Sequence, residues 1–331
     1  MPNSIFANAR ASALETGLLG ADRLSRMIDC ASPDDAVRIL QETGFGDGLS
    51  VSASESELLV EAEENKLGAF IRETSPEEKL TRFLLAKYDF RNAEAVMRAK
   101  HLRVDYRPMA AAEGVYSLAF LEEKIFADDY GAFGAPLKKA LAAADELFVG
   151  GGATGRKINA LFTRAMYAEM SALAGGNRVL AGIVSVRADA ANIGVALRTR
   201  NFALAQEMTV EGGVLGVEAL RILAEESAEL IREKMRFSPR RELVDAALED
   251  FSAGRPLTLL ERAADSAALT VLETEKYSDE GYLPFLRYCC KKTAELCNVQ
   301  IVLACLSNGA DKATARARLR GAYEGQNGYH R

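Results

Sequence analysis

Apolar residues recur every three or four positions along most of the chain, which is the period of helices that bury one face. This pattern predicts helices near residues 5–30, 33–43, 55–74, 76–104, 136–147, 155–175, 178–206, 213–235, 239–252, 256–276, 280–307 and 310–323. Loops are expected near residues 44–54, 105–135 and 148–154. The strand-like run at 182–186 is short and continues directly into a helical pattern. The sequence therefore predicts an all-α fold.

Several of these segments open with residues that favour helix starts. Ser32-Pro33-Asp34-Asp35 combines an N-cap serine with a proline in the first turn. Ser75-Pro76-Glu77-Glu78 and Ser54-Glu55-Ser56-Glu57 have the pattern of capping boxes, and Ser238-Pro239 is expected to begin a further helix. Gly44-Phe45-Gly46-Asp47-Gly48 predicts a helix stop followed by a turn.

Composition narrows the range of functions. The 331 residues carry a formal net charge of −6 and a pI near 5.3, the opposite of the balance typical of general nucleic-acid binders. Two histidines, His101 and His330, and no tryptophan are a poor inventory for metal or acid–base chemistry. We therefore expect no metal, no cofactor and no nucleic-acid partner.

The cysteines and the apolar segments indicate a soluble protein of a reducing compartment. Four of the five cysteines fall in one predicted helix, where their spacing is typical of packing residues and unsuited to disulfides: Cys30, Cys289, Cys290, Cys297 and Cys305. No secretory leader and no run of about eighteen uncharged apolar residues is apparent. Any membrane connection is therefore expected to go through a partner. The segment from residue 326 onwards is expected to be a frayed tail.

An internal repeat is the most informative feature of the sequence. The segment 88–100 aligns with 188–200, so that acidic, amide and basic residues fall at equal positions: Asp89 with Asp189, Asn92 with Asn192, Arg98 with Arg198 and Lys100 with Arg200. A weaker third copy contains Glu295 and Asn298 but has Ala304 and Leu306 at the basic positions. The repeat predicts three related helical units at residues 1–104, 105–206 and 207–331.

Helix geometry places Asp89, Asn92 and Lys100 on one stripe, while Arg98 points elsewhere. A carboxylate and an amide inside a helix lower its intrinsic stability, so they are expected to satisfy backbone or side-chain groups on a neighbouring helix. We interpret the stripe chiefly as a polar crossing that fixes helix packing. A partner-binding role for the basic ends and a chance alignment remain the alternatives.

These residues resemble a known family, the C subunits of the bacterial and archaeal V-type/A-type ATPases, whose eukaryotic members are the d subunits of V-ATPases. Phe6-Ala7-Asn8-Ala9-Arg10 is similar to the opening motif of the family, and the Asp89/Asn92 and Asp189/Asn192 segments resemble its D-x-x-N helices. Pro284–Tyr288 and Lys292-x-x-Glu295-x-x-Asn298 resemble its closing helix. Two departures are Leu306, where the family usually has lysine, and the loop Gly150-Gly151-Gly152.

The resemblance implies a funnel-shaped, pseudo-threefold arrangement of three helical units. It implies a non-catalytic member of the central stalk that couples the D and F stalk subunits to the membrane rotor ring, which is built of proteolipids (K or c), for proton or sodium transport. It also implies a cytoplasmic location, peripheral to the membrane through that ring.

Three further features have less specific explanations. Gly150–Lys157 superficially resembles a phosphate-binding loop, but Arg156 stands where that motif requires lysine, so a turn before a helix is expected. The acidic pair Asp128-Asp129 lacks the downstream carboxylate of a magnesium–diphosphate site, and Cys305 lacks a histidine partner. A basic cluster comprises Arg232, Lys234, Arg236, Arg240 and Arg241. It is expected to be a solvated helix end, with contact to an acidic stalk surface or lipid headgroups as the alternative.

Two other functions are compatible with an all-helical chain. A free-standing helical adaptor or scaffold would be expected to have repeats of roughly 34–47 residues, whereas the spacing between these copies is about 100 residues. An all-helical enzyme would require clustered acids or a nucleophile–base pair, and the sequence offers neither.

Overall fold

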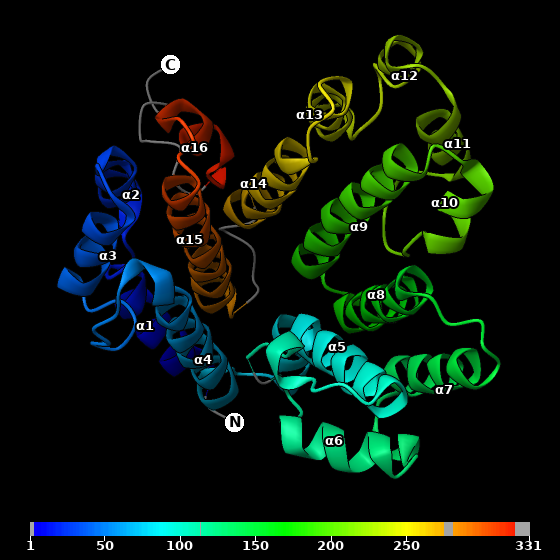
Figure 1. The fold of residues 1–331 in the computed structure, drawn as a ribbon, viewed down its shortest axis with the longest axis horizontal. Helices are drawn as coiled ribbons and strands as arrows, with labels where there is room; N and C mark the ends of the chain where they lie inside the picture. Colours follow the sequence, from blue (N-terminus) through cyan, green and yellow to red (C-terminus); the bar gives the residue numbers. More distant parts are fainter. Residues whose placement is uncertain (1–2, 113, 275–280, 322–331) are drawn as a thin grey trace. The chain divides into compact units, whose positions relative to one another are not determined.

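The computed structural model describes residues 3–112, 114–274 and 281–321, and in these segments the ordered elements are α-helices and short 3-10 helices without a strand. The predicted all-α fold is confirmed (Figure 1). His330 and the tail expected from residue 326 lie outside the described residues. All five cysteines are free thiols, and Cys289 and Cys305 are buried.

The chain divides into two compact units. One is formed by two segments, Met1–Pro76 and Glu261–Arg331, and we call it the two-segment unit. The other, Glu77–Leu260, is continuous in sequence, and we call it the contiguous unit. These boundaries differ from the expected ones at residues 104 and 206, and both D-x-x-N helices fall in the contiguous unit. The division into three related units and their pseudo-threefold arrangement stay predictions.

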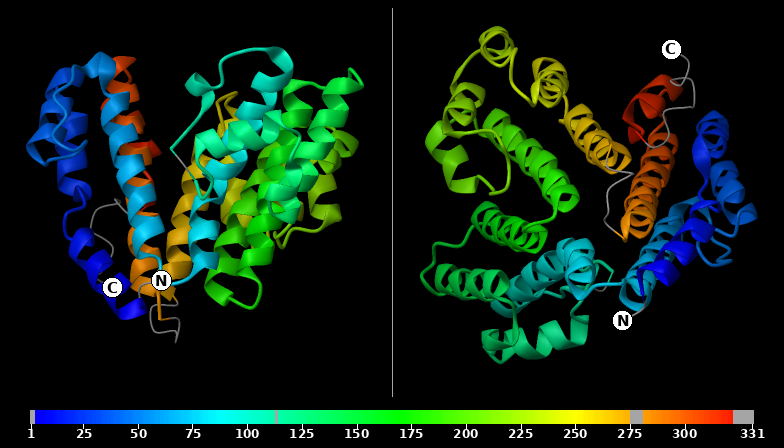
Figure 2. Two further views of the ribbon diagram at one scale, coloured as in Figure 1. Left: turned by 90° about the horizontal axis from the view of Figure 1, so that it is seen from below. Right: turned by 180° about the vertical axis from the view of Figure 1, so that it is seen from behind.

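The two-segment unit is built around one long helix. Its helices are α1 (Ser4–Glu15), α2 (Gly20–Asp29), α3 (Pro33–Glu42), α4 (Glu57–Thr74), α15 (Leu283–Ser307) and α16 (Lys312–Arg318), with most of α14 (Thr258–Thr274) and the 3-10 turn η1 (Ala53–Glu55). Helix α15 packs against α1, α2, α3, α4 and α16, and Figure 2 shows α4 alongside it. The rings of Phe70 and Phe285 stack between α4 and α15 with their centroids 5.4 Å apart. The core of this unit therefore joins the two ends of the described chain.

The contiguous unit is a series of helices packed on others that lie near them in the sequence. Its helices are α5 (Glu78–Leu102), α6 (Leu118–Phe126), α7 (Ala135–Val149), α8 (Gly155–Ala174), α9 (Arg178–Thr199), α10 (Phe202–Met208), α11 (Val217–Glu225), α12 (Ala228–Lys234) and α13 (Arg241–Ser252), with 3-10 turns η2 (Arg107–Met109) and η3 (Tyr130–Ala132). Helix α8 packs against α5, α7 and α9 (Figure 1). Helix α9 in turn packs against α10, α11 and α13, so α5 and α9 are the central helices that bear the repeated motif.

Three predicted helices are in fact divided. The helix expected at 5–30 is interrupted at residues 16–19, where the Leu19 N–H donates to Glu295 and Gly20 has a φ of +72°. The helix expected at 178–206 breaks at Arg200, which adopts the left-handed conformation with a φ of 47°. The helix expected at 213–235 becomes α11 and α12, because Ser227 caps a new start. The predicted loop at 105–135 contains helix α6.

The helix-start predictions were only partly right. Ser32 caps α3 by accepting the Asp35 N–H, as expected. The N-cap of α5 is Glu77 and not Ser75. The capping box before α4 is formed by Ser52 and Glu55 at the start of η1, two residues earlier than predicted. The glycine-rich turn after α3 is present, with positive φ at Gly44, Gly46 and Gly48. Capping signals overlap when several serines and acids stand close together, and packing selects between them.

Helix α9 is the one described helix long and apolar enough to cross a membrane by length and composition alone. Within its most apolar window, 61% is buried inside the structure. Asp189 and Asn192 lie on the buried side of this helix and bind other parts of the chain, which is typical of a core helix.

Candidate functional site

In the repeated motif, the carboxylate and the amide side chains form hydrogen bonds to the backbone of the loop that follows their own helix. On α5, Asn92 accepts a hydrogen bond from the Ala111 N–H at 2.8 Å and donates to the Ala112 carbonyl at 3.2 Å. On the same face, Asp89 accepts the Tyr116 N–H at 3.0 Å. Asn92 is fully buried, so these bonds satisfy polar groups that water does not reach.

Helix α9 repeats this arrangement. Asn192 accepts the Val210 N–H at 2.9 Å and donates to the Val210 carbonyl at 3.0 Å. Asp189 accepts the N–H groups of Val214 and Leu215 at 3.1 and 2.9 Å. The two sequence copies therefore adopt one local structure, in which a helix binds its succeeding loop through a carboxylate and an amide.

A glycine lies against the carboxylate in both loops. A Cβ added to Gly114 would lie 2.1 Å from Asp89 Oδ1, and one added to Gly213 would lie 2.2 Å from Asp189 Oδ1. A real side chain cannot approach an oxygen so closely. These glycines allow the loop backbone to approach the carboxylate, and the sequence alignment of the helices alone did not identify them.

The third copy is weaker in structure as well as in sequence. Asn298 on α15 accepts the Arg320 N–H at 2.7 Å, but its amide nitrogen has no partner among the described residues. Glu295 accepts the Leu19 N–H at 2.5 Å and so binds the connection between α1 and α2. Within the described part of the segment that follows α15, the bond shown is the one to the amide of Asn298.

The basic residues at the ends of the first two copies are engaged within the chain. Lys100 contacts Asp145 at 3.1 Å and the Tyr130 hydroxyl at 3.0 Å, and it also pairs with Asp128. Arg200 donates to the carbonyls of Leu223 and Glu226 at the C-terminal end of α11. Cations at this end of a helix interact favourably with its dipole. Both residues therefore join neighbouring elements of the contiguous unit.

The two repeated carboxylates have different electrostatic surroundings. Asp189 is fully buried, and Arg240 Nε lies 2.7 Å from its Oδ2. Arg240 Nη2 also donates to Ser185 at 2.7 Å, so the guanidinium is held on two sides. The sequence placed Arg240 in a basic cluster, whereas the structure separates it from that cluster as the counter-ion of a buried acid.

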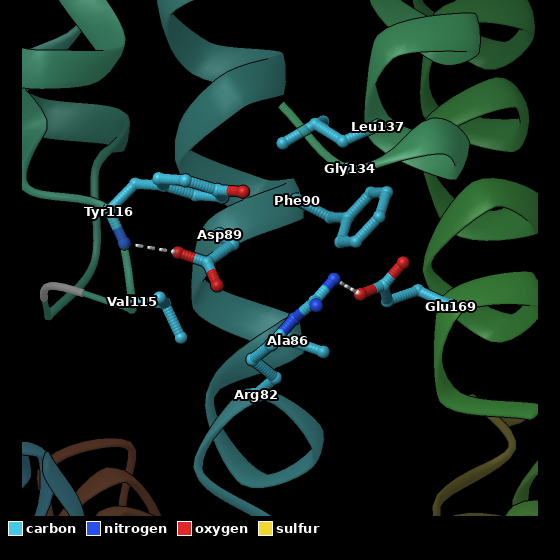
Figure 3. Close-up of a pocket in the computed structure, with 9 residues that line it drawn as sticks. All are labelled: Arg82, Ala86, Asp89, Phe90, Val115, Tyr116, Gly134, Leu137 and Glu169. Atoms are coloured by element: carbon cyan, nitrogen blue, oxygen red, sulfur yellow. Dashed lines mark hydrogen bonds and ion pairs between the residues drawn. The ribbon is translucent and has the colours of Figure 1, made fainter. Parts of the chain in front are cut away.

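Asp89 has no such cation in contact among the described residues (Figure 3). The nearest one, Arg82, pairs with Glu169 of α8 beside a cavity of about 20 Å³, which is enough for one water molecule. Burial raises the pKa of Asp89 to about 7, although the backbone N–H groups of Tyr116 and Val115 lower it in part. Glu169 raises the pKa further and Arg82 opposes that effect.

Replacing Asp89 with asparagine is therefore expected to stabilise the protein at pH 8 by on the order of 1–3 kcal/mol. The folded protein holds the Asp89 proton more tightly than the unfolded chain does. Ionising this group hence reduces stability progressively from about pH 4 to pH 7. Asparagine removes that loss and still accepts the Tyr116 N–H, but its NH2 group cannot accept the Val115 N–H, which offsets part of the gain. Urea unfolding at several pH values measures the difference between variant and wild type.

The matched control is Asp189→Asn, which should destabilise the protein, because it leaves Arg240 without its carboxylate. Equal effects of the two substitutions at pH 8 would contradict the assigned difference between the sites.

The other members of the basic cluster lie at the surface around α12. Lys234 pairs with Glu226 at 2.5 Å, and Arg241 pairs with Asp245 at 3.2 Å. Arg232 and Arg236 are exposed and form no ion pair within the described residues, and Arg236 lies over the ring of Phe237. The exposed part of the cluster is thus smaller than the sequence indicated.

The described residues contain no group of three or more histidine, cysteine, aspartate or glutamate side chains placed to hold a metal. The loop at 150–152 turns between α7 and α8, and Thr154 caps α8 by accepting the Lys157 N–H. Asp128 binds Lys100 and Tyr130 of the same chain. The candidate site is therefore a set of internal contacts in which the polar side chains of Asp89, Asn92, Asp189 and Asn192 bind the loops after their helices.

A comparison with protein families fits the finding that the conspicuous polar residues of this chain make structural contacts. The family model described as ATP synthase (C/AC39) subunit matches residues 7–318. The chain belongs to this family. It is accordingly a subunit of the V/A-type rotary ATPase class, and the suspected resemblance is confirmed. The search of curated proteins found no match.

Proposed function

We propose that this member of the C/AC39 family is a non-catalytic part of the central stalk, which turns with the D and F subunits and links them to the proteolipid rotor ring. The observation that carries the proposal is the family match over residues 7–318. In that role the protein would lie on the cytoplasmic face of the membrane and be held there by the ring.

The internal contacts between these polar side chains and the loops support this role on physical grounds. A part that transmits torque must resist deformation between its two attachment surfaces. Buried carboxylates and amides that bind the loops after α5 and α9 restrict how those loops move relative to their helices. The polar residues conspicuous in the sequence thus contribute to stiffness, and the proposal assigns them no bond-making step.

Removal and re-addition of the subunit test the proposal. We expect a complex stripped of this chain to keep ATP hydrolysis in its soluble head while losing ATP-driven ion pumping, and the purified chain to restore pumping. The chain should also bind the isolated ring and the D–F stalk in separate pull-downs. Binding to neither partner would contradict the proposal.

The exposed arginines provide a matched test of whether the α12 surface takes part. The double substitution Arg232→Glu and Arg236→Glu changes residues without an ion pair in the described structure, and Lys138→Glu with Lys139→Glu on α7 is a control for net charge. If α12 contacts an acidic stalk surface, only the arginine pair should weaken assembly, and more so at low salt. Arg240 is unsuitable for this experiment, because its replacement removes a buried counter-ion.

A further inference from the structure

The two-segment unit contains a cavity of about 390 Å³ that the proposed stalk function does not use. It is lined by residues of α1, α4, α15 and the turn after α3. This volume lies within the range of cavities that bind small organic molecules, and it is far larger than a single water requires.

One wall of the cavity carries a buried ion triad. Lys292 Nζ lies 2.6 Å from Glu63 Oε2 and 2.6 Å from Glu295 Oε1. The second oxygen of Glu63 accepts the Gly46 N–H and Lys66 Nζ, both at 3.1 Å. The second oxygen of Glu295 accepts the Leu19 N–H.

Because all four carboxylate oxygens already accept hydrogen bonds, a charged ligand would find no unmatched opposite charge on this wall. Its desolvation would therefore go largely uncompensated. The whole lining carries three cations, Arg10, Lys66 and Lys292, and three carboxylates, Glu63, Glu73 and Glu295, so it has no net formal charge and favours a neutral occupant.

Tyr288 supplies a buried polar group of the cavity that has no hydrogen-bond partner among the described residues. Its side chain is more than nine-tenths buried, and its ring packs edge-on against Phe70 at a centroid distance of 5.2 Å. No described residue forms a hydrogen bond with its hydroxyl. Burial raises the pKa of Tyr288 well above its usual range, and the charges of Glu295 and Glu63 add to this effect, so the hydroxyl keeps its proton.

Apolar side chains line the cavity alongside these polar groups. Leu67 and Phe70 of α4 and Phe45 of the turn line the cavity and are buried. An apolar body can replace water against these side chains, while a single polar group can pair with the tyrosine.

We propose that this cavity binds a small neutral molecule with an apolar, ring-sized body and one hydroxyl or carbonyl group that hydrogen-bonds to Tyr288. The site is independent of the stalk function, since it is formed within the two-segment unit alone.

Phenol, toluene and benzoate are suitable probes, because they share a ring and differ in one substituent. Titration of the full-length protein with methyl-labelled leucine, followed by NMR, should give saturable shifts at Leu67 and Leu14, which both line the cavity. We expect phenol to bind more tightly than toluene and benzoate not to bind. Failure of phenol to saturate, or equal affinity for phenol and benzoate, would overturn the proposal.

Two substitutions localise the interaction. Tyr288→Phe removes a hydroxyl that has no partner among the described residues, so it should leave the melting temperature unchanged while reducing phenol affinity by about 2- to 12-fold to the level of toluene. Ala69→Leu should block both probes, because Ala69 lines the cavity, whereas Ala62→Leu on the same helix should not. Undiminished phenol binding by Tyr288→Phe would show that the hydroxyl does not recognise the ligand, and undiminished binding by Ala69→Leu would show that the probes bind elsewhere.

Discussion

Replacing Arg240 with methionine is expected to destabilise the contiguous unit by about 3–5 kcal/mol, the usual cost of leaving one member of a buried ion pair alone. Asp189 is fully buried, and Arg240 is the one cation that the described structure places on it. Methionine keeps much of the apolar stem of arginine, so the loss should come from the missing charge and its bond to Ser185.

Hydrogen exchange measured by mass spectrometry can locate this loss. The peptides that should exchange faster are those of α9 and of the loop containing Val214 and Leu215, whose N–H groups bind Asp189. Denaturant unfolding gives the size of the effect.

The neighbouring residue offers a close control. Arg241 pairs with Asp245 at the surface, with 64% of the arginine side chain exposed, so Arg241→Met should cost about 0–0.5 kcal/mol. Adding Asp189→Asn to Arg240→Met should recover part of the stability, because it removes the uncompensated charge. If the double variant were as unstable as the sum of the two single variants, the assigned pairing would be wrong.

Replacing Lys292 with methionine should have an effect of similar size in the two-segment unit, about 3–5 kcal/mol. The substitution leaves Glu63 and Glu295 buried near each other with no ammonium group between them. Lys291→Met is the matched control and should cost less, because its partner Glu15 keeps Arg287 and the pair is partly exposed.

The pH dependence distinguishes this mechanism from simple loss of packing. Burial opposes ionisation of Glu63, but Lys292, Lys66 and the Gly46 N–H outweigh it and lower the pKa of Glu63. In the wild type, the stability from this group is therefore present above about pH 4.5 and lost as the pH falls below it. In Lys292→Met the destabilisation should shrink on acidification, since protonation removes the buried charges. A pH-independent loss would contradict the electrostatic explanation.

Helical periodicity predicted the fold class because a stripe of apolar residues is a local property of the sequence. The internal repeat and helix geometry indicated that Asp89, Asn92, Asp189 and Asn192 need partners. These were expected on a neighbouring helix, whereas the structure supplies them from loops. Their identity could not be predicted, because they are backbone groups of loops whose path depends on tertiary packing.

One of the three helix interruptions was missed because the residue type gives no signal. Arg200 ends α9 in the left-handed conformation, which is normally associated with glycine or asparagine. The strain is offset by the bonds that its guanidinium makes to Leu223 and Glu226, and these bonds exist only in the folded protein.

Which charged residues form ion pairs could not be predicted from the sequence either. Arg240 stands beside Arg241, and adjacency suggested that both are solvated, yet one is a buried counter-ion and the other lies at the surface. Glu63 and Lys292 lie in opposite parts of the sequence, so nothing local connects them. A single chain shows residue types but not which distant residues meet.

The two-segment construction has a consequence for the order of events at the ribosome. Helix α4 and its partner α15 belong to opposite ends of the described chain, so α4 must wait through the synthesis of the entire contiguous unit before α15 emerges. The contiguous unit, whose helices pack on others near them in the sequence, can mature while translation continues. The nascent helices α1–α4 meanwhile display unburied apolar faces, which makes them the segment of this chain most in need of chaperone protection.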